Sequence, residues 1–95
     1  MAAYVIFDEQ ILDPSRLEEY KSLAGPSITK LGGRFLARGG TITPLEGDWK
    51  PQRMVVLEFD NVEQARAWYD SPEYREARRA REGAMLMKAL IIEGV

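Results

Sequence analysis

The sequence predicts an α+β fold in which four antiparallel strands form one sheet and two helical segments cover one face of it. Two observations support this prediction. Short apolar runs have the two-residue period of strands, and the longer segments between them repeat apolar residues at helical spacing. The chain has 95 residues, so we expect a single domain spanning residues 1–95.

The first half of the chain begins with a predicted strand over Ala3–Leu12, rich in β-branched and aromatic residues. Asp13-Pro14 then starts a helix, because Asp suits the N-cap and Pro the first helical position. This helix runs to Gly32-Gly33, and we expect Gly25-Pro26 to kink or briefly break it, because Pro lacks an amide hydrogen. Arg34–Arg38 is the second predicted strand.

The second half opens with an irregular connection over Thr41–Lys50, followed by the most apolar predicted strand, Arg53–Phe59. Asn61 caps a helix that restarts at Ser71-Pro72, and Met85–Glu93 is the last strand. The order β-α-β-β-α-β in so short a chain is that of the ferredoxin-like fold. A swapped or permuted α+β sandwich is the alternative.

Both faces of the predicted sheet are largely apolar. In Arg53–Phe59 and in Met85–Glu93, each of the two alternating sets of side chains is mostly hydrophobic. The helices can cover only one face, so we expect a second copy of the chain to cover the other. Two sheets packed in this way would form a homodimeric α+β barrel. A monomer with an apolar open face is the alternative.

Two polar residues interrupt these faces and are the candidate catalytic residues. Strict alternation places Glu58 with Val56, and Arg38 with Leu36. If these faces coincide, both side chains point into one cavity. Glu58 would then be a general base, and Arg38 would neutralise an anionic intermediate. A purely structural ion pair between them is the alternative.

Aromatic residues are the other candidates that the pattern itself suggests. Trp68 has the helical spacing of a core residue, whereas Tyr69 and Tyr74 fit the core or a ligand equally well. Trp49 lies in a connection containing Gly and Pro, where it would act as a lid or a dimer contact.

Composition excludes several classes of function. The chain has no Cys and no His, which argues against thiolate zinc sites, iron–sulfur clusters, haem ligation and a Ser-His-Asp triad. We therefore expect no metal and no cofactor. The net charge of −2 and the absence of a long apolar segment predict neither a nucleic-acid partner nor a membrane span. With no export signal recognised, a cytoplasmic location is expected.

Five sequence segments occur together and in order: GGRFLARGG, LEGDW, RMVVLEF, ARAWYDSPEY and IIEGV. Their combination resembles a bacterial family of unknown function, DUF1330, in the dimeric α/β-barrel superfamily. The resemblance covers essentially the whole chain and implies a ferredoxin-like protomer in a homodimer. It also implies shared polar and aromatic positions. Besides Arg38 and Glu58 these are the candidate ligand-binding residues Arg34, Trp49, Trp68, Tyr69, Ser71 and Tyr74.

Two functions are consistent with these observations. The first is binding of a small molecule in a cleft, with no chemistry of its own. The second is a cofactor-free isomerase or monooxygenase acting on a small acidic or phenolic compound, which is the kind of chemistry that the wider superfamily includes. Glu58 discriminates between them, because a base needs access to a cavity whereas a structural carboxylate would be held by Arg38.

Overall fold

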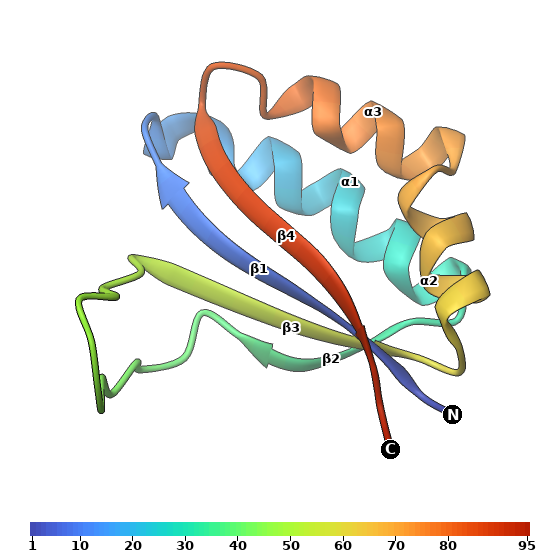
Figure 1. Ribbon diagram of the computed structural model, residues 1–95. Helices are drawn as coiled ribbons and strands as arrows, with labels where there is room; N and C mark the ends of the chain where they lie inside the picture. Colours follow the sequence, from blue (N-terminus) through green and yellow to red (C-terminus); the bar gives the residue numbers. More distant parts are fainter.

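The computed structural model describes all residues, 1–95, as one four-stranded antiparallel sheet with the helices on one face (Figure 1). The strands are β1 (Ala3–Ile11), β2 (Arg34–Arg38), β3 (Arg53–Phe59) and β4 (Met85–Glu93), in the spatial order β2-β3-β1-β4. The helices are α1 (Leu17–Lys30), α2 (Val62–Tyr69) and α3 (Pro72–Ala80), and the short 3₁₀ turn η1 (Pro14–Arg16) precedes α1. This arrangement confirms the predicted ferredoxin-like α+β fold.

Local capping explains where the helices begin. The Asn61 side chain accepts a hydrogen bond of 2.7 Å from the Gln64 amide, and Ser71 Oγ accepts one of 3.1 Å from the Tyr74 amide. Asp13 likewise caps the 3₁₀ turn, by accepting from the Ser15 amide. Of the kink or short break expected at Gly25-Pro26, the break does not occur, since α1 is continuous through both residues. A proline removes one hydrogen bond, and the surrounding turns hold the helix together there.

The core lies between the sheet and the helices. Strand alternation sends Val5 and Phe7 of β1, and Leu57 and Phe59 of β3, to this side, where each is at most 2% exposed. Trp68 of α2 packs at the centre and is fully buried. Gly33 permits this packing, because a Cβ there would come within 2.6 Å of the Phe59 ring.

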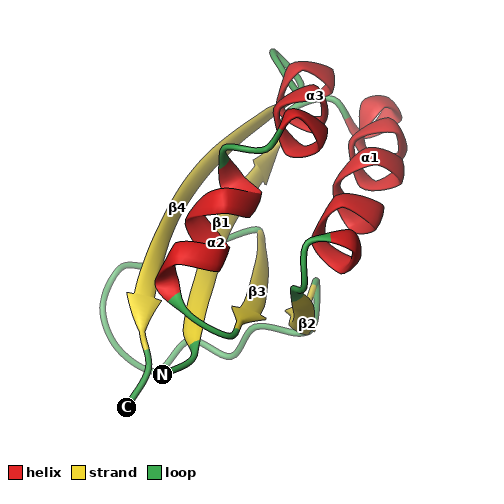
Figure 2. Cartoon of the chain, turned by 90° about the vertical axis from the view of Figure 1, so that its right-hand side faces the viewer, coloured by secondary structure: helices red, strands yellow, loops and turns green.

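The opposite face of the sheet carries no helix, as the side view shows (Figure 2). β1 and β4 are paired so that Ile6 lies opposite Leu90, and Tyr4 lies opposite Ile92. Leu90 is 56% exposed and Ile92 is 53% exposed, so apolar side chains lie uncovered on this face. We call it the open face. None of the helices has the length and apolar character that a membrane span requires.

Candidate functional site

A cleft of about 320 Å³ opens between α1 and the strands β1, β2 and β3. It exists because α2 packs directly on the sheet, whereas α1 packs chiefly against α3. The side of α1 that lines the cleft carries the small residues Ala24 and Gly25, and a Cβ added at Gly25 would meet no atom within 4 Å. Most of the remaining lining is apolar, including Phe7, Phe35 and Leu57. The volume is within the range of small-molecule sites.

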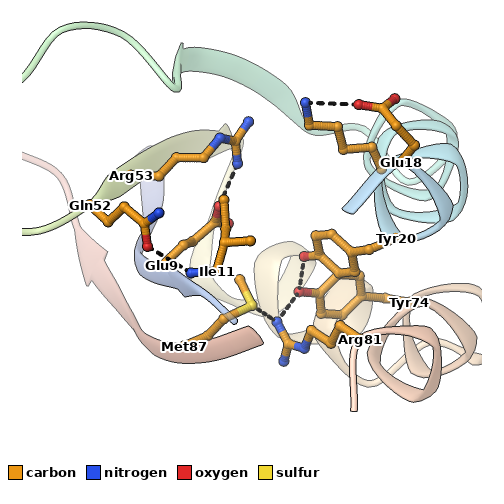
Figure 3. A network of polar contacts seen from close by, with 10 residues as sticks. Glu9, Ile11, Glu18, Tyr20, Gln52, Arg53, Tyr74, Arg81 and Met87 are labelled. Atoms are coloured by element: carbon orange, nitrogen blue, oxygen red, sulfur yellow. Dashed lines mark hydrogen bonds and ion pairs between the residues drawn. The ribbon is translucent and has the colours of Figure 1, made fainter. Parts of the chain in front are cut away.

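Glu9 is the most unusual residue in the cleft. Alternation along β1 places it on the same face as Val5 and Phe7, where it is 2% exposed. Its register partner on β3 is Arg53, whose Nη1 donates to Glu9 Oε1 in a close ion pair (Figure 3). Burial raises the pKa of Glu9 above its ordinary value, and the bond from Arg53 only partly opposes this. The cleft therefore contains a carboxylate that is costly to ionise.

Two buried tyrosines form a second polar group beside the cleft. The Tyr20 hydroxyl lies 2.8 Å from the Tyr74 hydroxyl, and Arg81 Nη1 donates to Tyr74 at 3.3 Å (Figure 3). Burial raises the pKa of both phenols, so they stay protonated at neutral pH. Tyr20 lines the cleft, which joins this network to the site.

Two further cations line the cleft from opposite walls. Arg38 of β2 lies over the Phe35 ring at 4.5 Å from its centroid, and no carboxylate lies within 4.0 Å of it. Lys21 of α1 is 3.5 Å from Glu18, a neighbour on the same exposed helix surface. With Arg53, the cleft holds three cationic side chains and one carboxylate.

The predicted shared cavity of Arg38 and Glu58 is wrong. A β-bulge in β2 lies between Phe35, which pairs with Leu57, and Ala37, which pairs with Val56. The extra residue shifts the alternation by one, so Arg38 pairs with Val55 and faces the cleft. Glu58 lies on the open face. The two residues therefore lie on opposite faces of the sheet and cannot act together at one site.

Glu58 instead pairs with a residue of the open face. Arg34 Nε donates to Glu58 Oε1 at 2.7 Å, and Arg34 Nη2 lies 3.5 Å from Asp60 Oδ1.

Trp49, in the β2–β3 connection, is 58% exposed, and its Nε1 donates to Asp8 Oδ2 at 2.8 Å. Arg34, Trp49 and Glu58 therefore lie outside the cleft.

The remaining predicted residues lie in or beside the core. Trp68 and Tyr74 are fully buried, and Trp68 Nε1 donates to Ser27 Oγ at 3.1 Å. Ser71 is the cap of α3, and its hydroxyl also donates to the Trp68 carbonyl at 2.7 Å. Tyr69 is half-buried beneath the Arg78 guanidinium, which is 4.4 Å from the centroid of its ring. Of the residues predicted for the site, only Arg38 and Trp68 line the cleft.

Four polar residues of the cleft were missed from the sequence: Glu9, Tyr20, Lys21 and Arg53. A signal existed for Glu9, because it follows Val5 and Phe7 in the apolar phase of its strand. Arg53 has the same phase relation to Val55 and Leu57. A charged residue in the buried phase of two strands indicates a buried pair. No comparable signal marks Lys21, which lies on α1 among charged residues.

The chain belongs to the family described as a domain of unknown function, DUF1330, which it matches over residues 2–95. No curated protein matches it in sequence.

Several solved structures share the fold. A protein of unknown function from Rhodopseudomonas palustris is 19% identical, with a TM-score of 0.77 over 99% of this chain and 82% of its own. A dimeric ferredoxin-like protein of unknown function from Thermobifida fusca is 18% identical, with a TM-score of 0.70 over 99% and 92%. SnoaB, a cofactor-independent oxygenase from Streptomyces nogalater, is 9% identical, with a TM-score of 0.67 over 99% and 93%. At these identities the likeness concerns the fold alone.

Proposed function

We propose that the protein binds a small molecule in the cleft between α1 and the sheet. The observation that carries this proposal is the position of Glu9, a nearly fully buried carboxylate on the wall of an apolar cleft of about 320 Å³. A ligand bound there would contact Phe7 and Phe35 and lie beside the Glu9–Arg53 pair.

Stability alone does not account for this arrangement. Burying an ion pair is often no better than burying apolar residues of the same size, and an open apolar cleft leaves hydrophobic side chains in contact with water. Both costs occur at the same place in this fold, at the wall shared by Glu9, Arg53 and the cleft. A site that must hold a ligand with both polar and apolar parts explains why they occur together.

Native mass spectrometry of gently purified protein tests the proposal. We expect a bound metabolite in the wild-type protein and in Gly25→Ala, because an added Cβ at this position meets open space. Gly25→Leu reduces the free volume of the cleft and should lose the metabolite while remaining folded. Retention of the same molecule by Gly25→Leu would contradict binding in the cleft. So would the absence of any bound molecule together with no cleft response in a fragment screen by NMR.

We also infer that the protein is a homodimer assembled through the open face. Leu86, Leu90 and Ile92 are each more than half exposed along β4, and Ile6 and Val56 continue this apolar surface across the sheet. Large uncovered apolar patches are rare on monomers. The structural neighbour from Thermobifida fusca is described as dimeric, which supports the same assembly here. Two open faces in contact would form the α+β barrel expected from the sequence.

A cofactor-free enzyme, an isomerase or monooxygenase, is the second candidate, and Glu9 is the observation that favours it. Burial raises the pKa of Glu9, which makes this carboxylate a stronger base toward a bound acid than an exposed glutamate. The role of general base then belongs to Glu9 rather than to Glu58. Incubating the co-purified molecule with protein in D₂O tests this idea: solvent deuterium should enter the molecule with wild-type protein and not with Glu9→Gln. Equal exchange with both proteins would exclude Glu9 as the base.

A further inference from the structure

The charge of the cleft is opposite to that of the whole protein. The chain has a formal net charge of −2, whereas the charged side chains that line the cleft are Lys21, Arg38, Arg53 and Glu9. These four give the cleft a formal excess of two positive charges. Apolar walls of low dielectric constant strengthen the field of such a cluster.

Only two of the three cations are free to meet a ligand. Arg53 is held by Glu9, and its side chain is only 15% exposed. Arg38 has no carboxylate partner, and its planar guanidinium suits a bidentate bond with a carboxylate. Lys21 shares only a distant, solvent-exposed contact with Glu18. An acid group between β2 and α1 would therefore meet Arg38 on one side and Lys21 on the other.

Glu9 places a different requirement on the ligand. Its Oε1 accepts from Arg53, while its Oε2 accepts no hydrogen bond from the protein. A carboxylate oxygen on the wall of a site is satisfied by a hydroxyl or N–H donor, and it repels a second negative charge. Between these polar ends the walls are formed by Phe7, Phe35 and Leu57, which fit a flat apolar body.

We propose that the ligand is an organic monoanion with an aromatic body and a hydroxyl group, as in a hydroxyaryl carboxylic acid. Its carboxylate lies between Arg38 and Lys21, and its hydroxyl donates to Glu9. This inference rests on the proposed function and specifies the chemical class of ligand. A cationic ligand is disfavoured by three positive side chains, and a neutral one forgoes the ion pair with Arg38.

Three matched probes test this class: 6-hydroxy-2-naphthoate, 2-naphthoate and 6-(hydroxymethyl)-2-naphthol. All three share the naphthalene ring system. Compared with the hydroxy acid, 2-naphthoate lacks the ring hydroxyl, and 6-(hydroxymethyl)-2-naphthol has a neutral hydroxymethyl group in place of the carboxylate. Titrations of ¹⁵N-labelled protein, followed through amide shifts of Ala24, Phe35 and other cleft residues, give each dissociation constant. We expect the hydroxy acid to bind best. Loss of the carboxylate should weaken binding at least about tenfold, and loss of the ring hydroxyl should weaken it several-fold.

Two arginines of β2 provide a matched pair of variants. Arg38→Gln removes the cleft cation and should reduce affinity for the two carboxylates at least about tenfold, with little change for the neutral probe. Arg34→Gln changes the same residue type on the open face and should leave all three affinities unchanged. Raising the salt concentration should weaken the binding of the two carboxylate probes and leave the binding of the neutral probe unchanged.

The outcomes separate this inference from the proposed function. If the neutral probe shifts the same cleft amides and binds as tightly as the hydroxy acid, the cleft is a binding site and the anionic class is wrong. Equal affinity of Arg38→Gln and wild type for the carboxylates would also overturn the class. If no probe shifts a cleft amide and no metabolite co-purifies, both the class and the proposed function fail.

Discussion

The two faces of the sheet each carry an arginine–glutamate pair, and the pairs differ mainly in what covers them. Glu9 and Arg53 lie under the helices, with side chains 2% and 15% exposed. Glu58 and Arg34 lie on the open face, with side chains 21% and 53% exposed. Both pairs join directly opposed residues of neighbouring strands, β1–β3 in the first case and β2–β3 in the second.

The difference shows that surroundings, rather than pairing, set the properties of these carboxylates. Burial raises the pKa of Glu9 even though Arg53 donates directly to it. On the open face, water solvates both charged groups, and such exposed pairs add little to stability. A dimer formed through the open face would bury the Arg34–Glu58 pair and make its surroundings more like those of the Glu9–Arg53 pair.

Breaking the buried pair should have the largest effect. Arg53→Met leaves Glu9 without a partner in the core, so we expect a loss of about 3 kcal/mol in the free energy of unfolding. The double variant Glu9→Gln/Arg53→Met should recover much of this loss, because no charge is left unpaired. Urea denaturation measures both values. Arg34→Met, the control on the open face, should change stability far less; an equal loss from the two arginines would mean that the faces do not differ.

Placing a charge on the open face should dissociate the proposed homodimer. Val56→Asp sets an unpaired carboxylate among apolar side chains, and we expect the dimer to weaken at least about a hundredfold. Analytical ultracentrifugation at micromolar concentration should then show a species near 10.8 kDa. Leu45→Asp is the control, because Leu45 is 92% exposed in the β2–β3 connection. A wild-type protein that is itself monomeric would rule out the assembly.

A change of pH should have a smaller effect, which acts on stability through the buried carboxylate Glu9. Because the pKa of Glu9 is higher in the folded protein than its ordinary value of 4.5, the folded state binds the proton more tightly. The contribution of Glu9 is therefore fully favourable below about pH 4.5 and declines as pH rises through the raised pKa. Wild-type protein should lose stability relative to Glu9→Gln as the pH rises above about 4.5, measured by urea denaturation at each pH. A difference that is constant with pH would contradict the raised pKa.

The smallest effect is expected at the exposed tryptophan. Trp49→Phe removes the hydrogen bond to Asp8 and should change stability by less than about 0.5 kcal/mol. It should also remove the long-wavelength part of the tryptophan emission, because Trp68 alone remains and is fully buried. Emission that keeps its long-wavelength part would show that Trp68 is reached by water.

The sequence predicts the elements of this fold well because each boundary has its own local cause. Asn61 and Ser71 cap helices through their own side chains, and Gly33 fits a contact too close for any other residue. The buried phase of β1 could also have indicated Glu9. Alternation along β2 could not predict on which face of the sheet Arg38 lies. The bulge depends on how β2 pairs with β3, a strand that follows later in the chain. For the same reason, strict alternation predicts that Arg38 and Glu58 share one face, whereas the structure has them on opposite faces of the sheet.

The bulge in β2 also has a consequence for aggregation. β2 is an outer strand of the sheet, and outer strands can recruit further strands into open-ended β-assemblies. The five-residue length of β2 and its extra residue interrupt the regular ladder that an incoming strand would have to match. The inserted residue thus makes this edge a poor template for strand addition, whereas β4, the other outer strand, is nine residues long and pairs with β1 without a bulge.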